Sequence, residues 1–370
     1  MMHGTEVVVL GAGVVGCAAA YYLARDGARV AIVEREAVGS GASGFAVGLL
    51  NPLVGTGIPG PMAHLAQQAF WMHKGLWPEI EQASGVDLQA REMPHLQLCF
   101  NEDDVRLGRQ DMARWDETEG FTAEWLDARY VLDLEPRISP LVAGAVLLRH
   151  IWVLDSYRLT LALLQSAEAL GAKFVHGEVD GIESVGGRVT GVRVGDKTLA
   201  CNSVVVALGP WSGQAMAGME SAVPVAPLKG QILHLEAPDE PFRYHMAGPG
   251  QVAHKADGLV WVASTEEEAG FDVTLTRDAR DSLMGRAVKM VPSLAELKLV
   301  RQTACIRPVT PDRQPIVGPL PGMTGAYLAT GAEKKGILFG PLMGRAVADL
   351  FMSGETALPI EPLSPGRFGG

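Results

Sequence analysis

The run Val7-Val8-Val9-Leu10-Gly11-Ala12-Gly13-Val14-Val15-Gly16 decides the fold near the start of this chain. Its four leading apolar residues predict a buried parallel strand, and a helix follows. Gly11 permits a tight turn, Gly13 lets the backbone approach a pyrophosphate, and Gly16 lets the helix pack close to the strand. The free N–H groups at the start of the helix favour phosphate binding.

Glu34 indicates a nucleotide site rather than a glycine-rich turn that serves only packing. It lies 18 residues after Gly16, at the end of the apolar run 29–33. A carboxylate at this place accepts hydrogen bonds from adenosine ribose hydroxyls. The G-x-G-x-x-G pattern alone is a weak signal, but here it lies between a strand and a helix and the acid follows. We therefore expect a dinucleotide-binding βαβ unit over residues 5–35.

The composition limits the class of protein. The chain has 370 residues, of which 48% are hydrophobic, and this length suffices for two domains. A net charge of -11 argues against bulk capture of nucleic acid. Four widely spaced cysteines without a C-x-x-C pair predict neither a disulfide framework nor a metal site, and favour the cytoplasm. The apolar stretch 7–24 carries the glycine pattern, so we expect neither a signal peptide nor a membrane span.

Periodicity predicts the remaining elements. Residues 188–207 are expected to form a hairpin of two strands, residues 225–302 look antiparallel, and the Pro- and Gly-rich tail after Leu358 is expected to fray. We expect helices at 62–83, 157–170 and 336–352, and strands at 173–176, 231–235, 259–263 and 326–331.

Nucleotide-domain features return twice along the chain, which predicts an interrupted layout. We assign 1–80, 145–225 and 303–370 to a nucleotide-binding domain, and 81–144 and 226–302 to a substrate domain. The predicted fold class is α/β, a Rossmann-like domain with an interleaved antiparallel α+β substrate domain. Flavoproteins commonly have this layout, because distant segments enclose their long cofactor.

Several segments resemble the D-amino acid oxidase superfamily, in particular glycine oxidase, monomeric sarcosine oxidase and the oxidase half of the enzyme that modifies 5-carboxymethylaminomethyl uridine in tRNA. The resemblance covers nearly the whole chain and implies FAD as the cofactor. Its most specific part combines Cys305-Ile306-Arg307-Pro308-Val309-Thr310-Pro311-Asp312 with the glycine turns at 315–318 and 327–338. The other matching segments are the fingerprint 11–16, the loop 39–52, and the strand and turn 204–213.

The resemblance also implies which residues bind FAD. The loop with the Ser43 hydroxyl would bind phosphate, although a capped turn is the alternative. The helix from Gly336 would direct its positive end at the pyrimidine edge of the flavin, unless it is an ordinary glycine-capped helix start. Beyond Gly11, Gly13, Gly16 and Glu34, the predicted cofactor residues are Val14, Val15, Arg35, Ala42, Ser43, Gly48, Leu49, Val179, Ala207, Leu208, Gly209, Trp211, Arg307, Gly331, Lys335, Gly336, Ile337 and Leu338.

Arg307 is the strongest candidate for contact with substrate. In glycine oxidase the arginine of the matching segment binds the substrate carboxylate, and a guanidinium suits this role because its fork holds a carboxylate bidentately. The alternative is a structural pair between Arg307 and Asp312. Cys305 matches the cysteine that carries the flavin covalently in monomeric sarcosine oxidase. We expect non-covalent FAD, with a covalent link through Cys305 as the alternative, because a lone buried cysteine is usually a small hydrophobe.

The chain also departs from the family pattern. Lys334 stands where glycine oxidase has an arginine, so a bidentate clamp is lost there. Glu333 could receive a cationic amine, or both residues could be solvated loop charges. His245, His254 and the acidic run 266–268 could face the flavin ring, although a structural role is the expectation for either histidine. The strand 260–265 lacks the lysine that activates oxygen in sarcosine oxidase, which leaves a dehydrogenase open.

The resemblance implies oxidation of an amine, a small amino acid or an N-substituted glycine. Hydride transfer from Cα to flavin N5 would give an imine that hydrolyses, with Arg307, Lys334 and Glu333 around the substrate. Oxygen, a quinone or an electron carrier would then accept the electrons. Dehydrogenation of a 2-hydroxy acid, oxidation of a tRNA uridine side chain and flavin binding without catalysis remain alternatives.

Overall fold

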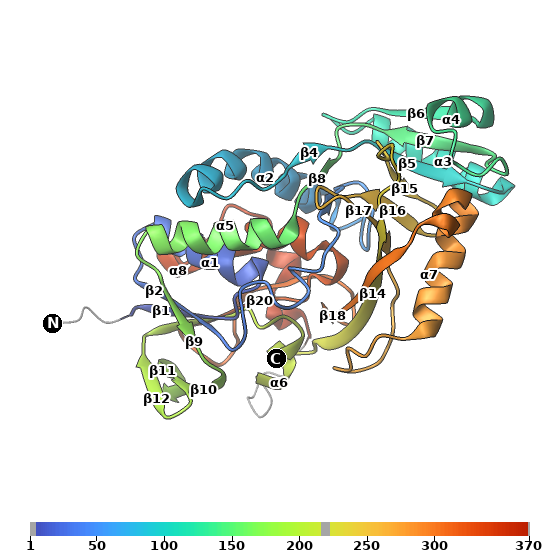
Figure 1. Ribbon diagram of the computed structural model, residues 1–370. Coiled ribbons are helices and arrows are strands. Elements are labelled where there is room, and N and C mark those ends of the chain that lie inside the picture. Colours follow the sequence, from blue (N-terminus) through green and yellow to red (C-terminus); the bar gives the residue numbers. More distant parts are fainter. Residues whose placement is uncertain (1–4, 216–222, 369–370) are drawn as a thin grey trace.

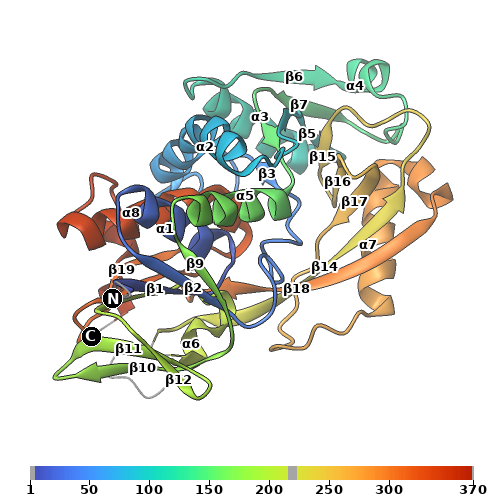
Figure 2. The same ribbon diagram turned by 60° about the vertical axis from the view of Figure 1, so that its left-hand side comes forward.

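Two large sheets lie side by side in the protein (Figure 1). The computed structural model describes residues 5–215 and 223–368. Residues 216–222, which we assigned to the nucleotide-binding domain, lie outside the described residues. Two turned views show the helices α1, α5 and α8 on one side of the molecule and α7 on the other (Figures 1 and 2).

The first sheet has six strands in the order β19-β20-β13-β1-β2-β9. All neighbours pair in parallel except the edge strand β19, which is antiparallel to β20. This confirms the predicted Rossmann-like domain. The strands are β1 (Val7–Leu10), β2 (Val30–Glu34), β9 (Lys173–His176), β13 (Ser203–Val206), β19 (Ile316–Pro319) and β20 (Ala326–Thr330).

Helices cover one face of this sheet and a small sheet covers the other. The helices are α1 (Val14–Arg25), α5 (Ser156–Ala169) and α8 (Gly336–Ser353), with α2 (Ala63–Ser84) packed on α5 and α8. Their apolar side chains form one core with alternate residues of β1, such as Val7 and Val9. The other β1 residues, Val8 and Leu10, pack against β10 (Val179–Val185), β11 (Arg188–Val194) and β12 (Lys197–Ala200). Because both faces are covered, the strand is apolar throughout, as expected for a parallel sheet.

The second sheet has eight strands in the order β18-β14-β17-β16-β15-β5-β7-β6. Neighbours are antiparallel except β15 and β5, which pair in parallel. The long strands β14 (Ala226–Glu236) and β18 (Leu299–Val309) form one edge. The others are β5 (His95–Cys99), β6 (Ala123–Asp127), β7 (Gly144–Leu148), β15 (His245–Ala247), β16 (Gln251–His254) and β17 (Leu259–Ala263).

Three helices pack on the eight-stranded sheet, and the described residues also form a second small sheet. Helices α3 (Glu102–Asp116) and α4 (Ala128–Leu134) contact β6 and β7, while α7 (Arg277–Met290) packs on β14 and β17. The small sheet consists of β3 (Leu49–Leu50), β4 (Arg91–Glu92) and β8 (Trp152–Val153). Because β7 and β18 belong to the eight-stranded sheet, that sheet extends into the ranges 145–225 and 303–370, and the division into domains remains a prediction.

Two predictions of local structure are wrong. Residues 188–207 do not form a hairpin, because β11 pairs with β10 and β12 whereas β13 joins the six-stranded sheet. The alternating exposure of β11 against the fully buried β13 reflects these different sheets. The tail after Leu358 does not fray up to residue 368. Leu363 is fully buried and Arg367 forms an ion pair with Asp312 at 2.8 Å.

Among the described residues, no helix combines the length and the hydropathy that crossing a membrane requires.

Candidate active site

A single large cavity of about 930 Å³ collects most of the predicted site residues. Its lining comes from both large sheets. The turn after β1 and the start of α8 contribute from the first, and Ile232 of β14, Ala263 of β17 and Arg307 of β18 contribute from the second. This volume lies in the upper part of the range typical of cofactor and substrate sites.

The turn after β1 forms one end of the cavity. Gly11 has a φ of +96°, and a side chain there would meet the Ala207 carbonyl at 2.7 Å. Gly16 does not line the cavity, and a Cβ there would lie 2.0 Å from the Gly11 carbonyl oxygen. Its role is therefore the close packing of α1 on the strand, as predicted. The backbone N–H of Val14 donates to Ser43 Oγ at 3.0 Å, which leaves the hydroxyl hydrogen free for a phosphate oxygen.

Glu34 is held at the carboxyl end of β2. Its Oε2 accepts from the Ala12 N–H at 2.9 Å, and its Oε1 accepts from the Glu36 N–H at 3.0 Å. Each carboxylate oxygen has a second lone pair that can accept from a ribose hydroxyl. Nearby, the Arg35 guanidinium lies 4.6 Å from the centre of the Trp211 ring and pairs with Glu178. These groups give the adenosine end of a dinucleotide both polar and flat apolar contacts.

The start of α8 forms another part of the cavity wall, next to the start of α1, since a Cβ on Gly340 would lie 2.9 Å from the Val14 side chain. Gly336, Ile337 and Leu338 line it together with Lys335, whose Nζ donates to the Asn51 carbonyl at 2.8 Å. Burial lowers the pKa of Lys335 to about 8. Gly331 does not line the cavity, and its φ of +79° places it where a Cβ would lie 2.6 Å from Thr310. The start of α8 and Lys335 therefore offer a positive helix terminus and a cation to an electron-rich ring.

Arg307 is buried on β18 and lines the cavity. Its guanidinium donates to the Thr265 carbonyl at 3.1 Å and to Ser264 Oγ at 3.0 Å. The alternative pairing with Asp312 is wrong, because Asp312 pairs with Arg367. Among the described residues Arg307 therefore has no carboxylate partner, and its charge is available to a bound anion.

Glu333 and Lys334 belong to a cluster of charges at the edge of the cavity. Lys334 pairs with Glu266, and Arg313 joins Glu266 at 2.8 Å to Glu333 at 3.2 Å. Glu333 is buried, has a φ of +45° and accepts from Thr56 Oγ1 at 3.1 Å. Burial opposes ionisation of Glu266, but the hydrogen bonds from Lys334 and Arg313 outweigh it and lower its pKa. Both predicted residues are thus paired with opposite charges, and neither is a freely solvated loop charge.

Of Cys305 and the two predicted histidines, only Cys305 lies at the cavity. Cys305 lines the cavity, and burial raises the pKa of its thiol. His245 does not line the cavity; it stacks on His95 with their Nδ1 atoms 2.8 Å apart, and burial lowers the pKa of both rings. His254 does not line the cavity either. The remaining predicted cofactor residues do so: Gly13, Val15, Ala42, Gly48, Leu49, Val179, Leu208 and Gly209.

Sequence reasoning missed the substrate-domain part of the cavity. This part includes Ser264, the turn 248–251 between β15 and β16, and Arg286 of α7. Lys255, directly after β16, was not predicted either; it does not line the cavity, and its Nζ donates to the Val47 and Leu154 carbonyls. Burial lowers its pKa to about 8. A glycine-rich turn between strands was the only sequence signal for this region.

The residues present fit FAD. A turn without side chains and the Ser43 hydroxyl suit the pyrophosphate, the Glu34 carboxylate suits the ribose, and the start of α8 suits the flavin. All three groups belong to the lining of one continuous cavity.

Comparisons with known proteins agree with this cofactor. The family model DAO, described as FAD dependent oxidoreductase, matches residues 6–350. Glycine oxidase of Pseudomonas putida is 28% identical over 98% of this chain and 99% of its own length. Glycine oxidase of Geobacillus kaustophilus is 29% identical over 100% and 99%. A crystal structure of glycine oxidase from Geobacillus kaustophilus superposes with a TM-score of 0.93, 29% identity and full coverage of both chains. The chain therefore belongs to the DAO family of FAD dependent oxidoreductases.

Proposed function

We propose that the protein oxidises an amine that carries a carboxylate, either a small amino acid or an N-substituted glycine. The observation that carries this proposal is Arg307, a buried guanidinium that lines the cavity and has only neutral protein partners. The similarity to glycine oxidases over the full chain supports the same reaction class.

In the proposed reaction each group has one task. The Arg307 fork binds the substrate carboxylate, while Thr265 and Ser264 hold the fork in one orientation. Bound FAD supplies the acceptor for a hydride from the substrate Cα. The start of α8 and Lys335 place positive potential in the wall of the cavity, where it favours a flavin that gains negative charge. The substrate amine enters neutral, so no dedicated base is required, and water hydrolyses the imine product.

Anaerobic reduction of the holoenzyme tests the proposal. The panel contains glycine, sarcosine, D-amino acids, D-proline, larger amines and 2-hydroxy acids, and the loss of the yellow flavin absorbance is recorded. We expect amino acids or N-substituted glycines to bleach the flavin. Bleaching by 2-hydroxy acids alone, or by no small molecule, would overturn the proposal in favour of a dehydrogenase of hydroxy acids or a modified-nucleoside substrate. Admission of air then separates oxygen from a quinone or electron carrier as the acceptor.

Cys305 decides how FAD is attached. We expect a colourless pellet and a yellow supernatant after acid precipitation, because burial raises the pKa of Cys305 and keeps its thiol protonated. A yellow pellet that becomes colourless in Cys305→Ala would show a covalent flavin instead.

A further inference from the structure

Five cations line the cavity, and they differ in their partners. Arg35 pairs with Glu178, and Lys334 pairs with Glu266. Arg307 and Lys335 have neutral partners, as described above. The fifth cation is Arg286.

The Arg286 side chain has no hydrogen bond or ion pair within the described part of the chain. Its Nε is buried without any partner, although the residue lies in the wall of the cavity. A guanidinium left in this state is costly, because a buried donor loses its water without gaining an acceptor. The cavity wall therefore contains a positive charge that pairs with no group among the described residues.

The strand register brings Arg286 near the Arg307 site. Residue Gln251 of β16 lies opposite Ala263 of β17, and both line the cavity. The next residue, Ser264, accepts the hydrogen bond from Arg307.

Gly250, the residue before Gln251, packs directly against helix α7. A Cβ placed on Gly250 would lie 3.3 Å from the Arg286 Cβ, so Gly250 brings the turn close to that helix. Arg286 therefore lies beside the turn that leads into β16, and the β17 side of the same strand pair leads to Ser264, the partner of Arg307. Both arginines line one cavity, so an extended ligand there has two guanidinium groups in its walls.

We propose that Arg286 and the turn 248–251 form a subsite for a second anionic group of the substrate. This inference rests on the proposed function, with Arg307 holding the carboxylate next to the reacting carbon. The substrate class is then a dicarboxylic amine, in which an N-substituent or a side chain carries the second carboxylate. Arg286 binds that distal carboxylate through its guanidinium group.

Binding of unreactive acids to the FAD-loaded enzyme tests the subsite. The probes are linear dicarboxylates from succinate to pimelate and the monocarboxylates of equal length, and the readout is the perturbation of the flavin spectrum. We expect one dicarboxylate to bind about tenfold or more tighter than its monocarboxylate. Arg286→Gln should abolish this preference and leave monocarboxylate binding within twofold. Arg280→Gln on the exposed side of the same helix is the matched control.

Turnover gives the second measurement. N-(ω-carboxyalkyl)glycines are compared with N-alkylglycines of equal length, and Arg286→Gln should lower kcat/KM only for the charged series. Equal binding of both acid series to the wild type, or equal losses for both amine series in the variant, would overturn the subsite. If dicarboxylates bind through Arg286 but no amine reduces the flavin, the proposed function fails while the anion subsite stands. Loss of folding would appear as loss of bound FAD, and Arg286→Lys then replaces Arg286→Gln.

Discussion

At the scale of single residues, the position of Arg307 depends on a side chain that is absent. Gly230 of β14 lies opposite Cys305 in the register, and a Cβ there would lie 2.0 Å from the Arg307 guanidinium. The neighbouring Lys229 and Gln231 are buried and hold the loop after β17, through Glu267 and Thr276. A glycine within a strand usually weakens it, but here it leaves room for the Arg307 guanidinium.

Replacement of Arg307 by lysine tests the guanidinium fork. We expect KM for a carboxylate-bearing amine to rise roughly ten- to hundredfold with FAD content unchanged, because one charge-assisted hydrogen bond and the bidentate geometry are lost. Steady-state kinetics and the flavin spectrum measure both quantities. Arg301→Lys on the same strand is the control, since that side chain is exposed and pairs with Asp257. An unchanged KM in Arg307→Lys would contradict the assigned role.

Lys255 makes stability depend on pH. It is 5% exposed, and burial lowers its pKa from 10.5 to about 8 in the folded protein. Between these values the unfolded chain binds more protons, so the free energy of unfolding rises with pH in this window. Relative to Lys255→Met, the wild type should gain stability on the order of 3 kcal/mol between about pH 8 and 10.5, and the difference should be flat below it. Urea unfolding at several pH values measures it, and a difference that falls with pH would contradict the buried cation.

The sequence predicted the site unevenly at this scale. Residues that a backbone requirement fixes, such as Gly11 and Gly16, were predictable because a tight turn and a close helix demand them. Arg286 and Ser264 were not, because their place in the cavity depends on strand register across the second sheet. The pairing of Asp312 with Arg367 was also missed, because 55 residues separate them and the tail has no periodic pattern.

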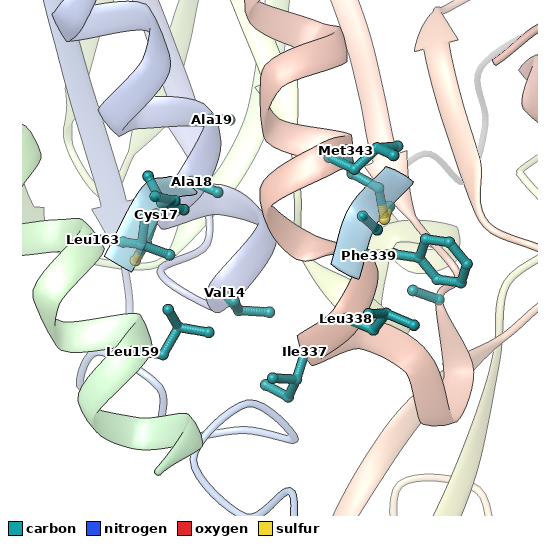
Figure 3. Close-up of a cluster of buried hydrophobic side chains, with 14 of the residues drawn as sticks. Val14, Cys17, Ala18, Ala19, Leu159, Leu163, Ile337, Leu338, Phe339 and Met343 are labelled. Atoms are coloured by element: carbon teal, nitrogen blue, oxygen red, sulfur yellow. The ribbon is translucent and has the colours of Figure 1, made fainter. Parts of the chain in front are cut away.

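At the scale of elements, the close contact of α1 with α8 holds the start of α8 at the cavity. Figure 3 shows Val14 and Ala18 of α1 in one buried cluster with Leu338 and Met343 of α8. Gly344 faces the α1 backbone so closely that a Cβ would lie 2.6 Å from the Ala18 carbonyl carbon. The helices α1 and α8, whose first residues both line the cavity, therefore pack directly against each other.

Gly344→Ala tests this helix contact. Alanine is a better helix former by about 1 kcal/mol, but the clash with backbone should cost about 1–3 kcal/mol beyond that. We expect a net loss of stability in urea unfolding and weaker FAD retention. Gly285→Ala in α7 is the matched control, because no atom lies within 4 Å of its added Cβ and it should gain about 0.5–1 kcal/mol. A gain in both variants would show that the helices separate without cost.

The boundaries of helices and strands were predictable where the hydrophobic periodicity extends over the whole element. The helix expected at 62–83 is α2 (Ala63–Ser84), and the strand expected at 173–176 is β9. The hairpin expected at 188–207 failed because β11 and β13 are both apolar strands that lie near each other in sequence. β11 pairs with its sequence neighbours β10 and β12, whereas β13 pairs with the distant strands β1 and β20, and no local pattern specifies that choice.

At the scale of the whole molecule, the cavity is a joint between two sheets. Val33 and Glu34 of the first sheet line it, and so do Ile232, Ala263 and Arg307 of the second sheet together with the start of α8. The chain crosses between the sheets repeatedly, so each sheet is assembled from distant segments. A ligand that spans the cavity therefore couples the two sheets, whereas a ligand restricted to the adenosine end contacts the first sheet alone.

FAD and ADP should consequently protect different parts of the apoprotein. With free ligand at a hundred times its Kd, either one adds about 2.7 kcal/mol of stability. In hydrogen exchange we expect ADP to protect residues 7–16 and 34–43, and FAD to protect these and also 45–50, 263–265 and 305–307. Added protection in the last two segments has a physical cause, because they belong to the second sheet and ADP cannot reach them. Equal protection by both ligands would mean that protein contacts alone couple the sheets, and the cofactor would then have no part in joining them.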